Sequence, residues 1–177
     1  MEEVILVDSF DRVLGQMEKI QTHQEGRLHR AFSVFIFNSK GGMLLQKRAT
    51  GKYHSGGLWS NACCGHPRPG EEVAAAALRR LREEMRITAS LTRLFPIVYM
   101  TPVGEHVFEY EYDHVFSGLS DETPEPDPDE VMEWKWIAPE ALCADIDVHP
   151  LHYTIWFQLL YKAMLKAATT GIANLEG

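Results

Sequence analysis

The strand-like segment VFEYEYDHV, residues 107–115, constrains the fold more than any other part of the sequence. Side chains alternate between the two faces of a strand, so Glu109, Glu111 and Asp113 share one face. Tyrosines alternate with them on the opposite face, which we expect to pack in the core. Neighbouring carboxylates repel one another unless water, cations or protons lie between them. The acidic face is therefore either exposed to solvent or part of a metal site, because hard divalent cations prefer carboxylate oxygens.

Strand and helix signals follow one another along the chain. Further strand-like runs lie at 3–8, 29–38, 43–48, 93–101 and 131–137. Amphipathic or aromatic helices are predicted at 71–85 and 152–167, and residues 50–70 read as a long loop. The chain has 177 residues, a usual size for one domain. These signals predict an α+β fold, a mixed sheet covered by helices in a single domain spanning 1–177.

The composition is that of an acidic globular protein with a formal net charge of −8. An acidic surface does not attract nucleic acid or an anionic membrane, so we expect neither as a partner. The sequence shows no signal peptide and no apolar run of about 18 residues, and it has an odd number of cysteines, three. We therefore expect a reduced, cytoplasmic protein. The acidic, proline-rich segment 121–130 is predicted to be a surface loop that the chemistry does not need.

The stretch NACCGHP, residues 61–67, places two cysteines directly before a glycine and a histidine. A disulfide between Cys63 and Cys64 would require a strained ring, which leaves a metal site or a reactive thiol. His23, His29 and His66 come from separate segments. Together with two carboxylates they would form a mixed nitrogen and oxygen shell, which suits Mn²⁺, Fe²⁺, Zn²⁺ or Mg²⁺.

The loop and helix after NACCGHP resemble the Nudix box, a loop–helix motif that holds a diphosphate through divalent cations. The resemblance rests on the ordered positions Gly65, Glu71, Arg79, Leu81, Glu83 and Glu84. Two positions depart from it, because a Nudix hydrolase is expected to have Glu where Arg80 stands and Gly where Arg86 stands. In the hydrolases, the carboxylate at position 80 helps to bind the catalytic Mg²⁺. The arginine that stands there instead has a forked guanidinium, whose geometry suits binding of a phosphate group. Diphosphate binding is therefore implied, and diphosphate hydrolysis is put in question.

Nearly the whole chain resembles the type I isopentenyl-diphosphate Δ-isomerases, a family with the Nudix fold. The matching segments are KIQTHQEGRLHRAFSVFIFN, QKRATGKYHSGGLWSNACCGHPRPGE, RRLREEM, FEYEYDHVF and YTIWFQ. The resemblance implies Cys64 and Glu111 as catalytic residues and a small allylic or homoallylic diphosphate as substrate. It implies a Mn²⁺ or Zn²⁺ site formed by His23, His29, His66, Glu109 and Glu111, and a diphosphate-bound Mg²⁺ at Glu84. It also implies diphosphate-binding cations at Lys19, Arg48, Lys52 and Arg80, and an aromatic pocket with Tyr99 and Trp156.

The reaction of that family moves a double bond between isopentenyl and dimethylallyl diphosphate. It needs one acid and one base around a flat substrate, because protonation of the alkene creates a tertiary carbocation. A tryptophan such as Trp156 can stabilise that cation. Two other functions remain open at this point. One is a Nudix pyrophosphohydrolase, and the other is a binding module in which Cys63, Cys64 and His66 hold a structural zinc.

Overall fold

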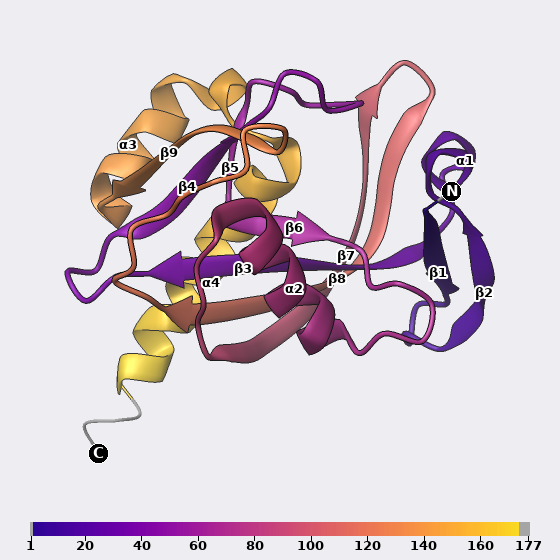
Figure 1. Cartoon of the computed structure of the whole chain (residues 1–177), viewed down its shortest axis with the longest axis horizontal. Helices are drawn as coiled ribbons and strands as arrows, with labels where there is room; N and C mark the ends of the chain where they lie inside the picture. The colour runs from indigo at the N-terminus through magenta and orange to yellow at the C-terminus, as the bar shows by residue number, and fades with distance from the viewer. Residues whose placement is uncertain (1, 174–177) are drawn as a thin grey trace.

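The computed structural model describes residues 2–173, and the side chains of residues 2–166 (Figure 1). In chain order the strands are β1 (Glu3–Val7), β2 (Val13–Glu18), β3 (His29–Phe37), β4 (Met43–Arg48), β5 (Trp59–Ser60), β6 (Cys63–Gly65), β7 (Leu91–Gly104), β8 (Val107–Leu119) and β9 (Val131–Ile137). The helices are α1 (Lys19–Glu25), α2 (Val73–Met85), α3 (Pro139–Val148), the single 3₁₀ turn η1 (Pro150–His152) and α4 (Ile155–Ala173).

Strand β3 is the centre of a mixed sheet. Along one edge it pairs in parallel with β8, from His29 opposite Glu111 to Phe37 opposite Leu119. Along its other edge it pairs with β1, β6 and β4, each antiparallel. Strand β7 pairs only with β8, so the backbone of this edge strand tolerates its two prolines. One parallel pair among antiparallel neighbours confirms the predicted mixed α+β sheet.

Helices cover both faces of this sheet. In Figure 1 α2 crosses in front of the sheet and α4 lies behind it. Phe32, Val34 and Ile36 of β3 pack with α2, whereas Phe35 packs with α3 and α4. This alternation follows from the two-residue period of a strand. The predicted arrangement of a sheet between helices is confirmed.

The acidic face of β8 is buried, so the interpretation that this face is exposed to solvent was wrong. Glu109, Glu111 and Asp113 are 5 %, 7 % and 0 % exposed, whereas Tyr110 and Tyr112 on the opposite face are half-buried. The prediction that these two tyrosines lie in the core was therefore wrong, whereas Phe116 on the same face of β8 does lie there. Buried carboxylates are rare unless they are paired or bind a cation.

Five elements were not predicted from the sequence: β2, α1 and α3, and the short strands β5 and β6, which lie in the segment 50–70 that was predicted to be a loop. Helix α1 has only seven residues, too few for an apolar repeat to be recognised. Its ends are capped locally, because the Glu18 side chain accepts a hydrogen bond from the Gln21 amide and Gly26 adopts a left-handed φ of 60°. This helix matters for function because it carries His23.

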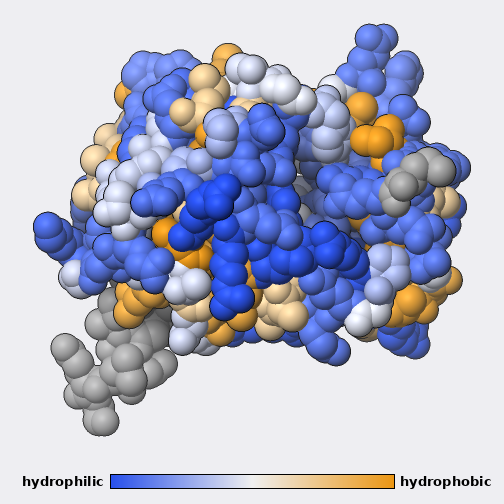
Figure 2. Space-filling view, in the orientation of Figure 1, coloured by the Kyte–Doolittle hydropathy of each residue, from blue (hydrophilic) through white to orange (hydrophobic). Residues whose placement is uncertain are grey.

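The surface agrees with the acidic composition. The face drawn in Figure 2 is mostly hydrophilic, with hydrophobic residues in smaller groups. Among the described residues, no helix combines the length and the apolar character needed to cross a membrane. Most of loop 121–130 is exposed, but its backbone is tied to the end of α2 by the amides of Glu125 and Asp127, which bond to the carbonyls of Met85 and Glu84.

Helix α2 ends on a residue in a strained conformation. Arg86 has a φ of 54° and its amide bonds to the carbonyl of Arg82. A left-handed φ disfavours side chains with a Cβ, which explains why glycine is expected at this position in a Nudix box.

We expect Arg86→Gly to stabilise the protein by about 0.5–1 kcal/mol, because relief of the left-handed strain exceeds the entropy cost of glycine in the unfolded chain. The matched control is Arg82→Gly, the same chemical change at an exposed position inside the helix, which should destabilise by about 1 kcal/mol. Urea unfolding measures both free energies. Equal destabilisation by the two changes would contradict the proposed strain at Arg86.

Candidate active site

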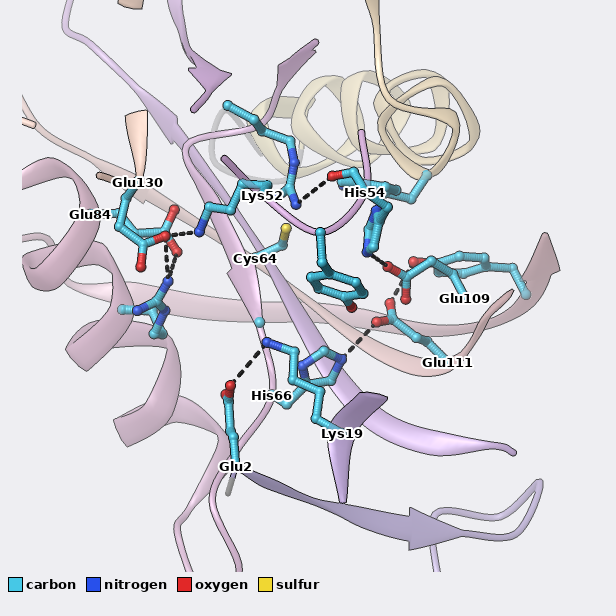
Figure 3. Close-up of a pocket in the computed structure, with 16 residues that line it drawn as sticks. Glu2, Lys19, Lys52, His54, Cys64, His66, Glu84, Glu109, Glu111 and Glu130 are labelled. Carbon is cyan, nitrogen blue, oxygen red and sulfur yellow. Dashed lines mark hydrogen bonds and ion pairs between the residues drawn. The ribbon is translucent and has the colours of Figure 1, made fainter. Parts of the chain in front are cut away.

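Residues from both halves of the chain line one cavity (Figure 3). It includes most of the residues that the sequence analysis predicted for the site: Lys19, Arg48, Lys52, Cys64, His66, Arg80, Glu84, Tyr99, Glu109, Glu111 and Trp156. The two remaining predicted residues, His23 and His29, are fully buried beside it. The thiol and the carboxylate predicted to be catalytic, Cys64 and Glu111, therefore open into the same space.

Three histidines and two glutamates form a compact cluster at one side of the cavity. One nitrogen or oxygen from each of His23, His29, His66, Glu109 and Glu111 lies within 4.8 Å of all the others. His29 Nε2 is 3.1 Å from His66 Nε2, and His66 Nε2 is 3.0 Å from Glu111 Oε1. Four separate parts of the chain meet here, namely α1, β3, β8 and the loop after β6.

Hydrogen bonds behind the cluster fix the orientation of two of its histidines. His23 Nδ1 lies 2.7 Å from the Lys19 carbonyl and His29 Nδ1 lies 2.8 Å from the Arg27 carbonyl. A carbonyl only accepts, so each Nδ1 carries the proton and each Nε2 presents a lone pair to the cluster. His23 Nε2 and one oxygen of Glu109 are buried and have no hydrogen-bond partner among the described residues. These orphaned atoms and this donor set fit a divalent cation.

Burial and mutual repulsion shift the protonation of the cluster. Burial, together with the nearby Glu109 and Asp113, raises the pKa of Glu111 well above its usual range. Burial also raises the pKa of Glu109, but the nearby His23 and the hydrogen bond with His54 outweigh it and bring that pKa well below its usual range. Burial and the neighbouring His23 lower the pKa of His29 to about 4. Tyr99 donates a 2.5 Å hydrogen bond to the second oxygen of Glu111.

The two adjacent cysteines face opposite sides of the sheet. Cys63 is fully buried in the core beneath α2, whereas Cys64 lines the cavity, and both are free thiols. A zinc site that uses both cysteines is therefore excluded by the alternation of the strand. Burial raises the pKa of the Cys64 thiol to about 12, although the nearby Arg48 opposes this effect. The thiol is consequently protonated at neutral pH in the structure described.

Cationic side chains line the opposite end of the cavity. Arg80 Nη2 lies 2.5 Å from Glu84 and 3.2 Å from Glu130, and Lys52 forms a close ion pair with Glu130. Gln46 donates a 2.8 Å hydrogen bond to the other oxygen of Glu84. This end therefore combines donors for phosphate oxygens with a carboxylate that can hold a cation.

An aromatic wall completes the cavity. Trp156 is 3 % exposed and donates a 3.1 Å hydrogen bond from its indole to Ser60 Oγ. The guanidinium carbon of Arg48 lies 5.2 Å from the centre of the Trp156 ring. Tyr99 is held by Glu111, so both predicted aromatic residues are fixed in orientation.

Four residues that line the cavity were not predicted from the sequence: Glu2, Tyr53, His54 and Glu130. His54 lies in the glycine-flanked segment GKYHSGG, which gives no periodic signal. Glu130 is the last residue of the acidic loop that was predicted to be a surface loop not needed for the chemistry. Its carboxylate contacts two cavity cations, so this residue of the loop lies at the cavity.

Comparison with known proteins defines the class of this fold and site. The family model described as NUDIX domain matches residues 27–157. A solved structure of DR0079 from Deinococcus radiodurans superposes with a TM-score of 0.69 at 25 % identity, covering 83 % of this chain and 90 % of that one. A MutT protein from Methanosarcina mazei gives a TM-score of 0.65 at 18 % identity, over 78 % of this chain and 94 % of that one. The second likeness concerns the fold alone.

Curated relatives narrow this class. A protein of Aromatoleum aromaticum named isopentenyl-diphosphate Δ-isomerase 2 is 50 % identical over 88 % of this chain and 82 % of its own length. Proteins with the name isopentenyl-diphosphate Δ-isomerase from Halorhodospira halophila and Serratia proteamaculans are 49 % and 46 % identical. They match 92 % and 91 % of this chain, and 94 % and 90 % of their own lengths. The chain belongs to the isopentenyl-diphosphate Δ-isomerases of the NUDIX family.

An ion pair fixes the loop after β6, which carries His66, against α2. Glu71 accepts two hydrogen bonds from Arg79, at 2.7 and 2.8 Å, and a third at 2.9 Å from the amide of Arg68. The bond with Arg79, together with the Arg68 amide, lowers the pKa of Glu71 to about 2 although burial opposes it. The side chains of Glu71 and Arg79 are about one-fifth exposed, so solvent screens part of this attraction.

We expect Glu71→Gln to destabilise the protein by about 1 kcal/mol at pH 7. The pKa of Glu71 is lower in the folded state than its usual value of 4.5, so this stabilisation is complete above about pH 4.5 and is lost as the pH falls toward 2. Urea unfolding at several pH values between 7 and 3 measures the difference between the two proteins. The control Glu72→Gln alters an exposed neighbour that makes no capping bond. A difference that does not shrink at low pH would contradict the charged pair.

Proposed function

We propose that the chain interconverts isopentenyl and dimethylallyl diphosphate, with Cys64 and Glu111 as the two groups that exchange protons with the substrate. The observation that supports this assignment best is the opening of both side chains into one cavity, with a histidine and glutamate cluster at one side and cations at the other. A five-carbon alkene with a diphosphate tail matches this division, with the diphosphate at the cationic end.

The cationic end is proposed to bind the diphosphate. Lys19, Arg48, Lys52 and Arg80 supply donors that together match the oxygens of two phosphate groups. Glu84 would hold a Mg²⁺ ion that bridges to the diphosphate, since Mg²⁺ usually binds through one or two carboxylates and the phosphates of a substrate. Arg80 already neutralises Glu84 in the structure described, which fits binding better than hydrolysis.

The reaction needs two proton transfers at different carbons. One of the two groups delivers a proton to the terminal methylene carbon, which leaves a tertiary carbocation. The other removes a proton from the carbon next to the diphosphate-bearing carbon, and the double bond forms there. The same steps in reverse regenerate isopentenyl diphosphate. The group that donates the first proton must be protonated, and the group that accepts the second must not be. Burial raises the pKa of both Cys64 and Glu111, which favours proton donation, whereas a cation at the cluster would favour the carboxylate form of Glu111.

The cluster of His23, His29, His66, Glu109 and Glu111 is proposed to hold Mn²⁺ or Zn²⁺. When bound, such an ion would offset the repulsion between the carboxylates and tune the acidity of Glu111. Tyr99 keeps the second oxygen of Glu111 in place through its short hydrogen bond. Tyr99 and His66 thus hold the two oxygens of Glu111 in place from opposite sides of the carboxylate.

Cys64→Ala should lower kcat by about 10²–10⁴-fold, because it removes one of the two proton-transfer groups. Metal content and folding should stay unchanged, and Cys143→Ala, which alters a free thiol in α3, should keep full activity. The assay follows the formation of dimethylallyl diphosphate and the release of phosphate or pyrophosphate in the same reaction. Full isomerase activity of Cys64→Ala would refute the assignment, and release of phosphate without isomerisation would favour a Nudix pyrophosphohydrolase.

Trp156 is proposed to stabilise the carbocation through the face of its indole ring. A desolvated cation–π contact is worth about 2 kcal/mol, which corresponds to about 30-fold in rate. We therefore expect kcat to fall in the order Trp, Phe, Leu at position 156, with about a 30-fold loss for Trp156→Leu. The affinity for inorganic pyrophosphate, measured by calorimetry, should change little. A Trp156→Leu enzyme with the kcat of the wild type would show that the ring is only packing.

A further inference from the structure

His54 is a buried side chain in the cavity to which neither the sequence nor the proposed chemistry assigns a role. It lies in the loop between β4 and β5 and is 8 % exposed. Its ring points toward Glu109 at the metal side of the cavity (Figure 3). Because a buried imidazole costs free energy unless its nitrogens are satisfied, the partners of His54 indicate what it does.

Both nitrogens of His54 have a polar neighbour. Nε2 lies 2.8 Å from Glu109 Oε1, and Nδ1 lies 3.2 Å from the hydroxyl of Ser55. The carboxylate only accepts, so Nε2 carries the proton and donates to Glu109, while the Ser55 hydroxyl donates to Nδ1. This assignment follows from the hydrogen-bond network.

The hydrogen bond from His54 leaves only one oxygen of Glu109 for the cluster. Glu109 Oε2 lies 3.2 Å from His23 Nε2, and both atoms lack a hydrogen-bond partner among the described residues. The distance of 3.2 Å between these two acceptor atoms allows both of them to bind the same cation. Oε1 is therefore anchored by His54, and Oε2 is directed to the ion.

The position of His54 is itself fixed by its surroundings. The Tyr53 ring meets it edge-on at 4.2 Å between centroids, and the Trp156 ring does so at 5.7 Å. Arg48 donates a 3.4 Å hydrogen bond to its backbone carbonyl. The compact group of five ligand atoms does not include His54, so it lies outside the ligand shell.

We propose that His54 is a positioning residue that anchors one oxygen of Glu109, so that Glu109 binds the metal through the other oxygen alone. This inference rests on the metal site of the proposed function. Outer hydrogen bonds of this kind orient metal ligands, and their loss typically weakens metal binding by 10–100-fold. Through its contact with Trp156, His54 also links the metal cluster to the aromatic wall of the cavity.

The test separates the donor from the ring. His54→Phe keeps an aromatic ring but removes the N–H donor, whereas His54→Gln keeps a donor at nearly the same place and removes the ring. Binding of Mn²⁺ and Zn²⁺ to the full chain is measured by competition with a fluorescent chelator. We expect His54→Phe to weaken Mn²⁺ binding by about 10–100-fold and His54→Gln to stay within about threefold of the wild type. At saturating Mn²⁺, kcat of His54→Phe should recover to within about threefold of the wild type.

His152→Phe, the same change at an exposed histidine, is the control and should bind metal like the wild type. His54→Leu gives a second donor-free variant if the phenyl ring prevents folding. Unchanged affinity in the donor-free variant overturns the proposal, and so does His54→Gln binding as weakly as His54→Phe. A kcat that stays low at saturating metal would instead assign His54 to the reaction itself. Failure of the proposed function is seen separately, as a wild-type protein that binds metal but does not isomerise the substrate.

Discussion

The parallel pairing of β3 with β8 is the interaction on which the rest of the site depends. It sets His29 opposite Glu111 and leaves both side chains buried on the face toward α4. Helix α1 adds His23, and the loop after β6 adds His66. Removal of two carboxylates from water costs several kcal/mol per ion unless other charges compensate. A divalent cation in this cluster would provide that compensation, so metal binding and folding are expected to be coupled.

One face of the sheet forms the hydrophobic core and the other forms the cavity. The face beneath α2 is an apolar core that includes Cys63, whereas the face toward α4 carries the cavity and Cys64. One residue of shift along β6 would exchange the two thiols. Helix α2 contributes Arg80 and Glu84 to the lining of the cavity. The arginine there replaces a carboxylate of a hydrolytic Nudix box, and the ion pair that it forms with Glu84 belongs to a site suited to hold a diphosphate.

Much of this arrangement could be predicted from the sequence, but the burial of the acidic strand face could not. The two-residue period placed Glu109, Glu111 and Asp113 on one face, as the structure confirms. Which face is buried depends on histidines that other segments bring to it, and these are not visible in the local pattern of β8. The resemblance to the isomerase family predicted residues that the structure brings together in one cavity, although their roles stay predictions. His54 and Glu130 were missed because both lie in loops, where no period marks a residue that faces inward.

The central claim is that the cluster holds one metal ion beside a substrate that lies between Cys64 and Glu111. A crystal structure with Mn²⁺ and an unreactive analogue of isopentenyl diphosphate tests this claim directly, because anomalous scattering locates the metal. The account predicts one Mn²⁺ ion bound by the three histidines, one oxygen of Glu109 and Glu111. It also predicts the allyl carbons of the analogue between the sulfur of Cys64 and the carboxylate of Glu111. A metal bound elsewhere, or an analogue that leaves either group out of contact, would contradict the account.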